Sequence, residues 1–377
     1  MGGLGMRFVQ FADSHLNSSG AVAAELRSAF ERACALAVDR KADVVLLPGD
    51  LFDYETADED TAALITRTLG DIAPIPVYIA PGNHDSLRPG SPYFGEWPAN
   101  VHIFTEPRFE SFMLAGMDCS ITGIAHAHRG ITDRLLADAI PALDAGTRIL
   151  LFHGSRDGYR PSDKENVIPF SDAELIAQGF TYAAIGHYHS LATISDENGD
   201  ARAAYSGCLQ GRRLDETGVK CALVGEIDTQ GGVELEQVEV AERRIVRVDV
   251  DVTGSRDPDQ VFARIDAEVG KQARKQDIIY AFAKGTLPLG LEIDASAWES
   301  RQGYYRASLG ILGIEQEYDL EAMARESAAP TLRSAFVRRM LERQDCADDE
   351  QRLVLRDAMI YGLSALDGRR LRPRDVD

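Results

Sequence analysis

The sequence predicts an α/β fold, a four-layer α/β/β/α sandwich in which helices flank two packed β-sheets. Short apolar runs alternate with segments of helical period in the first eighty residues, which indicates an α/β core. From about residue 101 the pattern changes to closely spaced short strands without long helices between them. Mixed strands in two blocks, with helices outside them, favour two sheets packed face to face.

The N-terminal elements follow from their apolar spacing and from the residues that stop them. The helix expected at 21–40 carries apolar residues three to four positions apart, at Val22, Leu26, Phe30, Ala33 and Ala37. Pro-Gly pairs end two of the expected strands, at Pro48 and at Pro81. A second helix is expected at 58–69. Strands are expected at 7–13, 43–47, 76–80, 101–104, 110–114, 120–125, 148–152 and 182–185.

The second half divides into hairpin strands, a small αβ module and a helical end. Strands at 201–206, 219–227 and 232–239 have the pattern of hairpins, with Gln230-Gly231-Gly232 as a turn. Beyond residue 244 the chain predicts strands at 244–252, 278–287 and 304–312 and a helix at 257–272. Helices broken near Cys346 follow. We therefore expect three domains: a main domain at 1–244, a capping domain at 245–318 and a helical C-terminal region at 319–377.

Composition restricts the class of protein. No stretch of the 377 residues is long and apolar enough to cross a membrane, and the first residues lack the pattern of a secretory signal. The five cysteines are scattered, which fits free thiols in a reducing cytoplasm. A net charge of −20 argues against a protein whose outer surface wraps nucleic acid. Two bound dications would nevertheless reverse the local field inside a cleft.

Five short motifs carry the expected chemistry, and each follows an apolar run. They are Asp13-x-His15, Gly49-Asp50, Gly82-Asn83-His84-Asp85, His153-Gly154 and Gly186-His187-x-His189. Carboxylate, amide and imidazole ligands together suit Mn²⁺, Fe or Zn²⁺. Asp50 is the natural bridging ligand, because a carboxylate has two oxygens and can serve both ions of a two-metal site. The set therefore predicts metal-assisted phosphoester hydrolysis.

The spacing within the motifs supports convergence on one site. Asp13 and His15 are two residues apart, as are His187 and His189, so each pair projects to one side of extended backbone. Strands of an α/β sheet collect their ligands at the carboxyl ends. Any one motif occurs by chance in many chains, and a single histidine is more often a satisfied core residue than a ligand. All five motifs in this order are specific.

Further segments match a known family. They are Leu47–Asp53, Pro81–Ser86, Ser91–Tyr93, Trp97–His102, Tyr205–Arg212 and Glu216–Lys220. In these segments the chain resembles the calcineurin-like metallophosphoesterases, and within them the Mre11/SbcD DNA repair nucleases, with the bacterial YhaO-type exonuclease branch nearest. The resemblance covers about residues 6–240 and is looser over 245–310. Ser14, Cys208 and Cys221 depart from the family pattern, and these departures bear on the shape of a loop rather than on the metals.

The resemblance implies a role for each motif residue. The first metal would be held by Asp13, His15, Asp50 and His189, and the second by Asp50, Asn83, His153 and His187. His84 would stabilise or protonate the leaving oxygen, and Asp85 would orient His84. Two divalent ions, most simply Mn²⁺, would activate the attacking water.

The implied function is a Mn²⁺-dependent DNA exonuclease or endonuclease of repair, located in the cytoplasm and without a membrane partner. The resemblance also implies an SMC/Rad50-like coiled-coil ATPase as a partner, and a homodimer is a further expectation. One alternative is a small-molecule phosphodiesterase or phosphatase acting on nucleotides, which the acidic charge favours. The other is a non-catalytic scaffold for an SMC-like ATPase, which the complete ligand set disfavours.

For several residues outside the motifs, an ordinary structural or surface role competes with a functional one. His126 and His128 form another His-x-His pair, for which we expect a place behind the ligands or on the surface. His102 is expected to pack within a strand. Arg212 and Arg213 could contact a phosphate backbone or lie in a solvated loop. Basic residues of the tail could bind DNA or only solubilise the end: Arg369, Arg370, Arg372 and Arg374.

Overall fold

The computed structural model describes residues 5–16, 22–53, 58–141, 145–159, 165–325 and 331–368. Contacts divide the chain into two compact units, Met1–Ile245 and Val246–Asp377. The three-part division expected from the sequence stays a prediction. The expected roles of the basic tail residues Arg369, Arg370, Arg372 and Arg374 lie outside the described residues.

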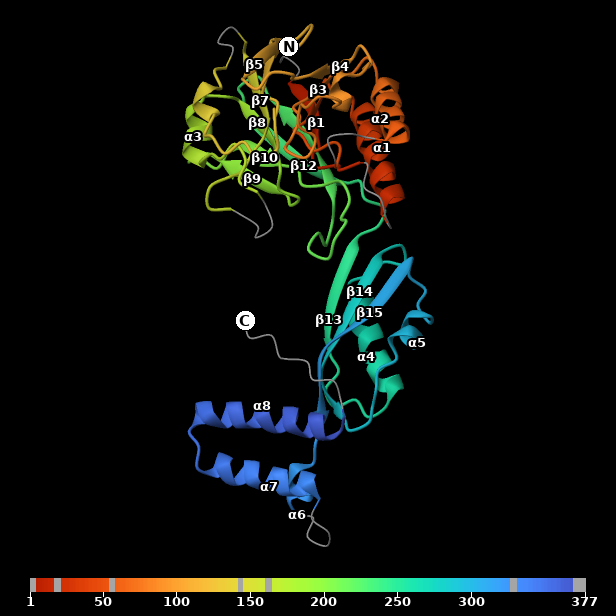
Figure 1. Cartoon of the computed structure of the whole chain (residues 1–377). Helices are drawn as coiled ribbons and strands as arrows, with labels where there is room; N and C mark the ends of the chain where they lie inside the picture. The colour runs from red at the N-terminus through yellow and green to blue at the C-terminus, as the bar shows by residue number, and fades with distance from the viewer. Residues whose placement is uncertain are drawn as a thin grey trace. The chain divides into compact units, whose positions relative to one another are not determined.

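Two six-stranded sheets form the first unit (Figure 1). The first has the order β12-β11-β1-β2-β3-β4, and the second has the order β5-β6-β7-β8-β10-β9. The strands of the first sheet are β1 (Met6–Gln10), β2 (Val44–Leu47), β3 (Val77–Ile79), β4 (Val101–Ile103), β11 (Cys221–Ile227) and β12 (Val233–Glu239). Those of the second are β5 (Glu110–Met113), β6 (Cys119–Gly123), β7 (Thr147–His153), β8 (Tyr182–Gly186), β9 (Ala192–Ser195) and β10 (Ala201–Tyr205).

Helices cover the outer faces of both sheets, and a separate core lies between the sheets. Helices α1 (Ala23–Asp39) and α2 (Glu59–Asp71) pack on the first sheet, where the ring of Phe30 meets that of Phe11 edge-on at 6.0 Å. Helix α3 (Asp172–Ala177) and the 3-10 turns η1 (Pro92–Phe94) and η2 (Leu136–Asp138) complete this unit, with α3 and η2 on the second sheet. Between the sheets, Phe8 packs on Tyr182 with ring centroids 4.8 Å apart. The predicted four-layer sandwich is confirmed.

Some elements differ from the sequence-based expectation. Strand β10, expected to form hairpins with the strands that follow it, lies in the second sheet between β8 and β9, whereas β11 and β12 form the expected antiparallel hairpin in the first sheet. Strand β9 and helix α3 were not expected. A helix of six residues is too short to show a period, although the capping box of Ser171 and Glu174 marks its start.

The second unit joins a three-stranded sheet to a group of helices. Its sheet has the order β13-β14-β15 with β14 and β15 parallel. Its elements are β13 (Ile245–Asp251), α4 (Pro258–Gly270), β14 (Ile278–Pro288), α5 (Ala295–Glu299), β15 (Arg306–Glu317), α6 (Leu320–Arg325), α7 (Leu332–Asp345) and α8 (Asp349–Leu366). Trp298 fills the core beside the sheet, and its indole donates to Asp266 at 2.8 Å. Helix α7 ends at the expected break, Cys346.

Among the described residues, every helix is too short or too polar to cross a membrane. All five cysteines are free. Four are buried, and Cys346 is exposed.

Candidate metal centre

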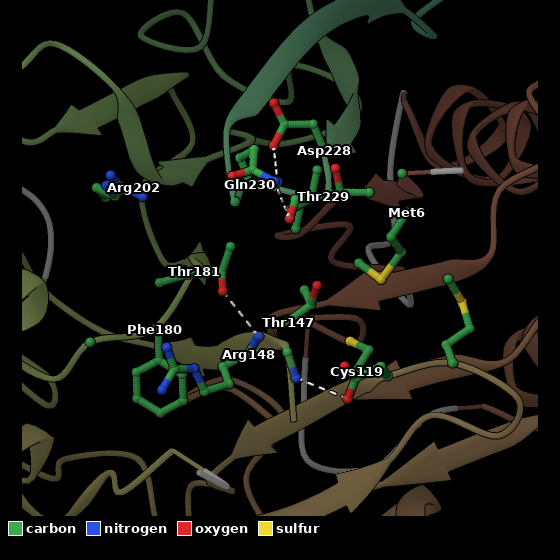
Figure 2. Close-up of a pocket in the computed structure, with 18 of the residues that line it drawn as sticks. Met6, Cys119, Thr147, Arg148, Phe180, Thr181, Arg202, Asp228, Thr229 and Gln230 are labelled. Atoms are coloured by element: carbon green, nitrogen blue, oxygen red, sulfur yellow. Dashed lines mark hydrogen bonds between the residues drawn. The ribbon is translucent and has the colours of Figure 1, made fainter. Parts of the chain in front are cut away.

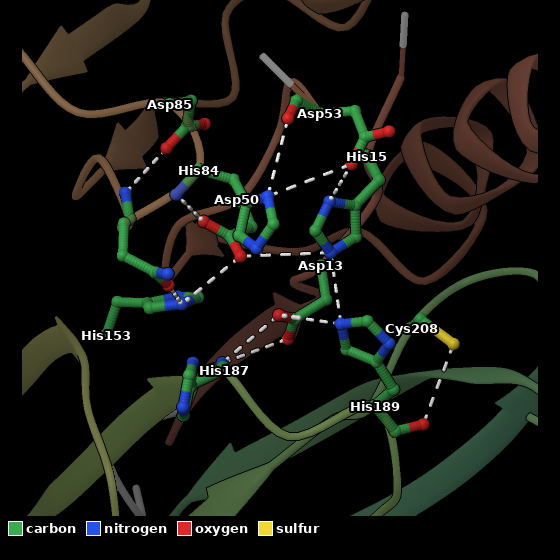
Figure 3. Close-up of polar contacts among 12 residues, drawn as sticks. Asp13, His15, Asp50, Asp53, His84, Asp85, His153, His187, His189 and Cys208 are labelled. Carbon is green, nitrogen blue, oxygen red and sulfur yellow. Dashed lines mark hydrogen bonds and ion pairs between the residues drawn. The ribbon is translucent and has the colours of Figure 1, made fainter. Parts of the chain in front are cut away.

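The motif residues sit where five strands of the first unit end. Asp13 and His15 follow β1, Asp50 follows β2, and Asn83 and His84 follow β3. In the other sheet, His153 ends β7, and His187 and His189 follow β8. Strands β1 to β3 run parallel, as do β7 and β8, so each sheet gathers its motifs at one edge. Figure 3 shows the side chains from both sheets converging.

The backbone at these positions is held in an uncommon conformation. Asp13, His15, Asp50 and His187 have φ angles of 50°, 44°, 53° and 110°. Non-glycine residues rarely adopt positive φ, and such strain gathers at functional sites. Backbone hydrogen bonds hold the first two motifs together, since Asp13 N donates to Gly49 O at 3.1 Å and His15 N to Asp50 O at 2.9 Å. The fold thus aims these side chains at the cost of local strain.

The Asp50 carboxylate lies between the two expected metal positions. Its Oδ2 is 3.7 Å from His15 Nε2 on one side and 3.3 Å from His153 Nε2 on the other. On the first side, His189 Nε2 lies 3.6 Å from Asp13 Oδ1. This placement is the one that a bridging ligand needs.

The remaining expected ligands lie on the second side. His153 Nε2 is 2.9 Å from Asn83 Oδ1, and the ring centroids of His153 and His187 are 5.1 Å apart. Ligand atoms of Asp13, His15 and His189, and those of Asp13, Asp50 and His153, form two groups within 4.8 Å. The structure brings all seven expected ligands together, while their ligand roles stay a prediction.

The electrostatics of the cluster suit divalent cations. Burial lowers the pKa of His15 to about 4, which leaves its imidazole neutral and able to ligate. Burial also lowers the pKa of His153, but the adjacent Asp50 carboxylate outweighs it and raises this pKa to about 9. The buried carboxylate therefore favours positive charge beside His153, which a metal ion would supply. The donor set and its field both fit two metal ions.

Glycines make room for the cluster. A Cβ on Gly49 would lie 2.6 Å from His153 Nδ1, and one on Gly186 would lie 2.8 Å from the same atom. Both glycines belong to the sequence motifs, and the structure explains why glycine is needed at these positions. The strand ends approach His153 too closely for any side chain.

His84 lies at the edge of the cluster, and its partner differs from the expected one. Its backbone N donates to Asp50 Oδ1 at 2.9 Å, and its Nδ1 is 3.4 Å from Asp53 O and 3.9 Å from Asp53 Oδ1. The expectation that Asp85 orients His84 is corrected. The Asp85 carboxylate instead accepts from Leu51 N at 2.7 Å, Gly82 N at 2.6 Å and Tyr93 Oη at 2.5 Å. Asp85 clamps the motif loops together.

Sequence reasoning missed two carboxylates that lie beside the first expected metal position. Asp53 and Glu216 occur in the family-like segments but were given no site role, and Arg212 was considered only for contact with a phosphate backbone. Glu216 Oε1 lies 2.5 Å from His189 Nδ1, and Asp53 Oδ1 lies 3.0 Å from His15 Nδ1. Burial raises the pKa of Glu216, but the hydrogen bond to His189 and the charge of Arg212 prevail and hold it well below its usual range. Acidic residues in loops carry no periodic signal that would have found them.

The other histidines lie where an ordinary structural or surface role would place them, as expected. His126 is buried behind the cluster, with its Nε2 2.8 Å from His153 O, and His128 is exposed. His102 stacks on Tyr78 with centroids 4.7 Å apart. Neither of the residues that depart from the family pattern near this point disturbs the ligands: Ser14 is buried, and Cys208 Sγ contacts His189 O at 3.6 Å.

A large cavity of the first unit lies away from this cluster. Its volume is about 700 Å³, and Thr147, Arg148 and Thr181 are among its lining residues (Figure 2). Thr147 begins β7 whereas His153 ends it, so the cavity lies at the opposite end of the strand. The cavity lacks the clustered donors, and we place the chemistry at the metal centre.

Comparison with known proteins agrees with this geometry. A profile of the calcineurin-like phosphoesterase family matches residues 6–191. The chain is 30% identical over 244 residues to the uncharacterized metallophosphoesterase YhaO of Bacillus subtilis, covering 63% of this chain and 58% of that protein. It is 29% identical over 270 residues to the DNA double-strand break repair protein Mre11 of Aeropyrum pernix, covering 65% and 64%. The chain thus spans about three fifths of the length of these two relatives.

Solved structures match at lower identity. A dimetal phosphatase from Danio rerio aligns with a TM-score of 0.41 and 9% identity, covering 63% of this chain and 97% of that one.

Proposed function

Because the chain carries a calcineurin-like metallophosphoesterase domain, whose family profile matches residues 6–191, we propose that this hydrolase cleaves phosphodiester bonds of DNA with two divalent metal ions, most simply Mn²⁺, as a nuclease of DNA repair. The observation that supports it best is the position of the Asp50 carboxylate between His15 and His153, with the other donor side chains gathered beside them. The relative from Aeropyrum pernix, a DNA double-strand break repair protein, points to DNA as the substrate.

The residues of the cluster divide the work. Bound metal ions would neutralise the phosphodiester and supply a nucleophile at neutral pH. One ion would be held by Asp13, His15, Asp50 and His189. The other would be held by Asp50, Asn83, His153 and His187. Their strained, buried placement fixes the donors before substrate arrives.

His84 is suited to act on the leaving group. Its side chain is 29% exposed, in contrast to the fully buried His15 and His153, so a substrate can reach it. The hydrogen bond from its backbone to Asp50 ties it to the metals, and Asp53 lies beside its Nδ1. An imidazole held in this way can protonate the departing oxygen.

The test is hydrolysis of end-labelled linear DNA by the purified full chain with Mn²⁺. We expect Mn²⁺-dependent cleavage that a chelator abolishes. Intact DNA under conditions in which two Mn²⁺ ions bind would refute DNA as the substrate.

A second candidate, a phosphodiesterase or phosphatase acting on nucleotides, is favoured by the net charge of −20, which opposes a polyanionic substrate. Rates on bis-p-nitrophenyl phosphate and cyclic nucleotides, set against rates on DNA, discriminate the two. Rapid cleavage of cyclic nucleotides without cleavage of DNA supports this candidate.

The partners named from the family resemblance are part of the proposal. An SMC/Rad50-like coiled-coil ATPase and a homodimer are tested by co-purification with such an ATPase encoded in the same genome and by sedimentation of the chain alone.

A further inference from the structure

The two histidines expected at the first metal are each backed by a carboxylate. His189 Nδ1 lies 2.5 Å from Glu216 Oε1, and His15 Nδ1 lies 3.0 Å from Asp53 Oδ1. These are the outer nitrogens, because both Nε2 atoms face the cluster, 3.0 Å from one another. At His189 this contact is a hydrogen bond, which keeps the proton on Nδ1 and leaves the lone pair on the inner nitrogen, whereas Asp53 makes a close charge contact with His15.

Arg212 joins the two carboxylates. Its backbone N donates to Glu216 Oε2 at 2.7 Å, and its Nη1 donates to Asp53 Oδ1 at 3.1 Å. Its side chain is only 15% exposed, and that of Glu216 only 4%. At this burial the charged groups are weakly screened, and each restrains the other strongly.

In the described part of the chain, a backbone carbonyl faces one ring nitrogen of each histidine expected at the second metal. His153 Nδ1 lies 2.9 Å from Pro48 O, and His187 Nε2 lies 2.8 Å from Glu165 O. A backbone carbonyl fixes the orientation of an imidazole but adds no formal charge. Carboxylates make stronger hydrogen bonds and raise the basicity of the ligand further. The two sites therefore differ in what stands behind their histidines.

We propose that Glu216, Arg212 and Asp53 form a carboxylate–arginine–carboxylate clamp that positions His15 and His189 and makes the first metal site the tighter of the two. Glu216 and Arg212 are positioning residues, because they reach the metal only through the histidines. The inference rests on the proposed two-metal function. Because of the loop that carries Arg212 and Glu216, the first metal site should fill before the second, whose histidines face backbone carbonyls.

The test is Mn²⁺ binding to the full chain, with free Mn²⁺ followed by electron paramagnetic resonance. Wild type is expected to show a tighter and a weaker class of site. In Glu216→Gln the tighter class should weaken by about 10–100-fold, the usual effect of removing such a partner, while the weaker class stays unchanged. Arg212→Met leaves both carboxylates in place and should weaken the same class, which covers the case in which Glu216→Gln does not fold.

Matched controls are Glu226→Gln, a glutamate paired with Arg7 on the surface, and Arg67→Met, an exposed arginine of α2 paired with Glu31. Both should bind as wild type does. The clamp is overturned if the folded Glu216→Gln and Arg212→Met proteins bind Mn²⁺ with wild-type affinity in both classes of site. It is also overturned if both classes lose affinity equally. If wild type itself neither binds two ions nor hydrolyses bis-p-nitrophenyl phosphate, the proposed function fails as well, which separates the two failures.

Discussion

The Nε2 atoms of His15 and His189 lie 3.0 Å apart, although 174 residues separate them in the chain. Two imidazole nitrogens at this distance repel through their lone pairs unless a proton or a cation lies between them. The Asp13 and Asp50 carboxylates beside the pair add negative charge. The pair is therefore built to share a cation, which makes metal loading the first property to test.

Asp50→Asn should remove the shared ligand with little change in size. Because the carboxylate faces both expected metal positions, we expect weaker Mn²⁺ binding at both and a loss of at least about 10²–10³-fold in hydrolysis. Calorimetric Mn²⁺ titration and initial rates on DNA measure the two effects. Asp249→Asn, at an exposed aspartate, is the matched control. Wild-type binding by Asp50→Asn would remove Asp50 from the metal site.

His84→Gln should separate chemistry from metal binding. The imidazole is partly exposed at the edge of the cluster, so its loss should leave the Mn²⁺ affinity unchanged while lowering kcat by about 10²–10⁴-fold. Mn²⁺ titration measures the affinity, and initial rates of DNA hydrolysis by the same preparations give kcat. His128→Gln changes an exposed histidine and should retain full activity. If metal affinity and kcat fall together, His84 is a ligand and not an acid.

Tyr93→Phe tests the corrected role of Asp85. The Tyr93 hydroxyl donates to the buried Asp85 carboxylate, which also fixes the backbone at Leu51 and Gly82. Loss of the hydroxyl should lower the free energy of unfolding by about 1–3 kcal/mol. The midpoint of urea unfolding measures it, with Tyr305→Phe at a half-exposed tyrosine as the control. An unchanged midpoint contradicts a clamp through Asp85.

Most of the sandwich and the convergence of the seven expected ligands could be predicted from the sequence, because parallel strands carry strong apolar runs and end at the motifs. The pairing of strands that are far apart in the sequence could not be predicted. Nothing local places Ala201–Tyr205 beside Tyr182–Gly186 instead of beside the strand that follows it, Cys221–Ile227. Contacts such as that of His189 with Glu216 join loops brought together only by the folded sheets, and no spacing encodes them. The family resemblance also suggested Asp85 as the partner of His84, whereas in the folded loops Asp53 lies beside the His84 ring.

Gly186→Ala tests whether close approach of the strand ends shapes the metal centre. Gly186 pairs with His153 across β8 and β7, and a Cβ there would meet His153 Nδ1 at 2.8 Å and the Pro48 carbonyl. That carbonyl lies 2.9 Å from the same nitrogen, so the added methyl group must displace His153 or its partner. Overpacking of this kind costs about 1–3 kcal/mol, and the second metal should bind more weakly while the first is spared.

Thermal unfolding and Mn²⁺ titration of Gly186→Ala give the two values. For a unit of this size we expect the melting temperature to fall by roughly 2–12 °C. Gly130→Ala is the control, because a Cβ at Gly130 meets no atom within 4 Å. The two metal classes decide the interpretation: a loss confined to the weaker class places His153 at the second metal. Weakening of the tighter class alone would move His153 to the first site and reverse the assignment of the two positions.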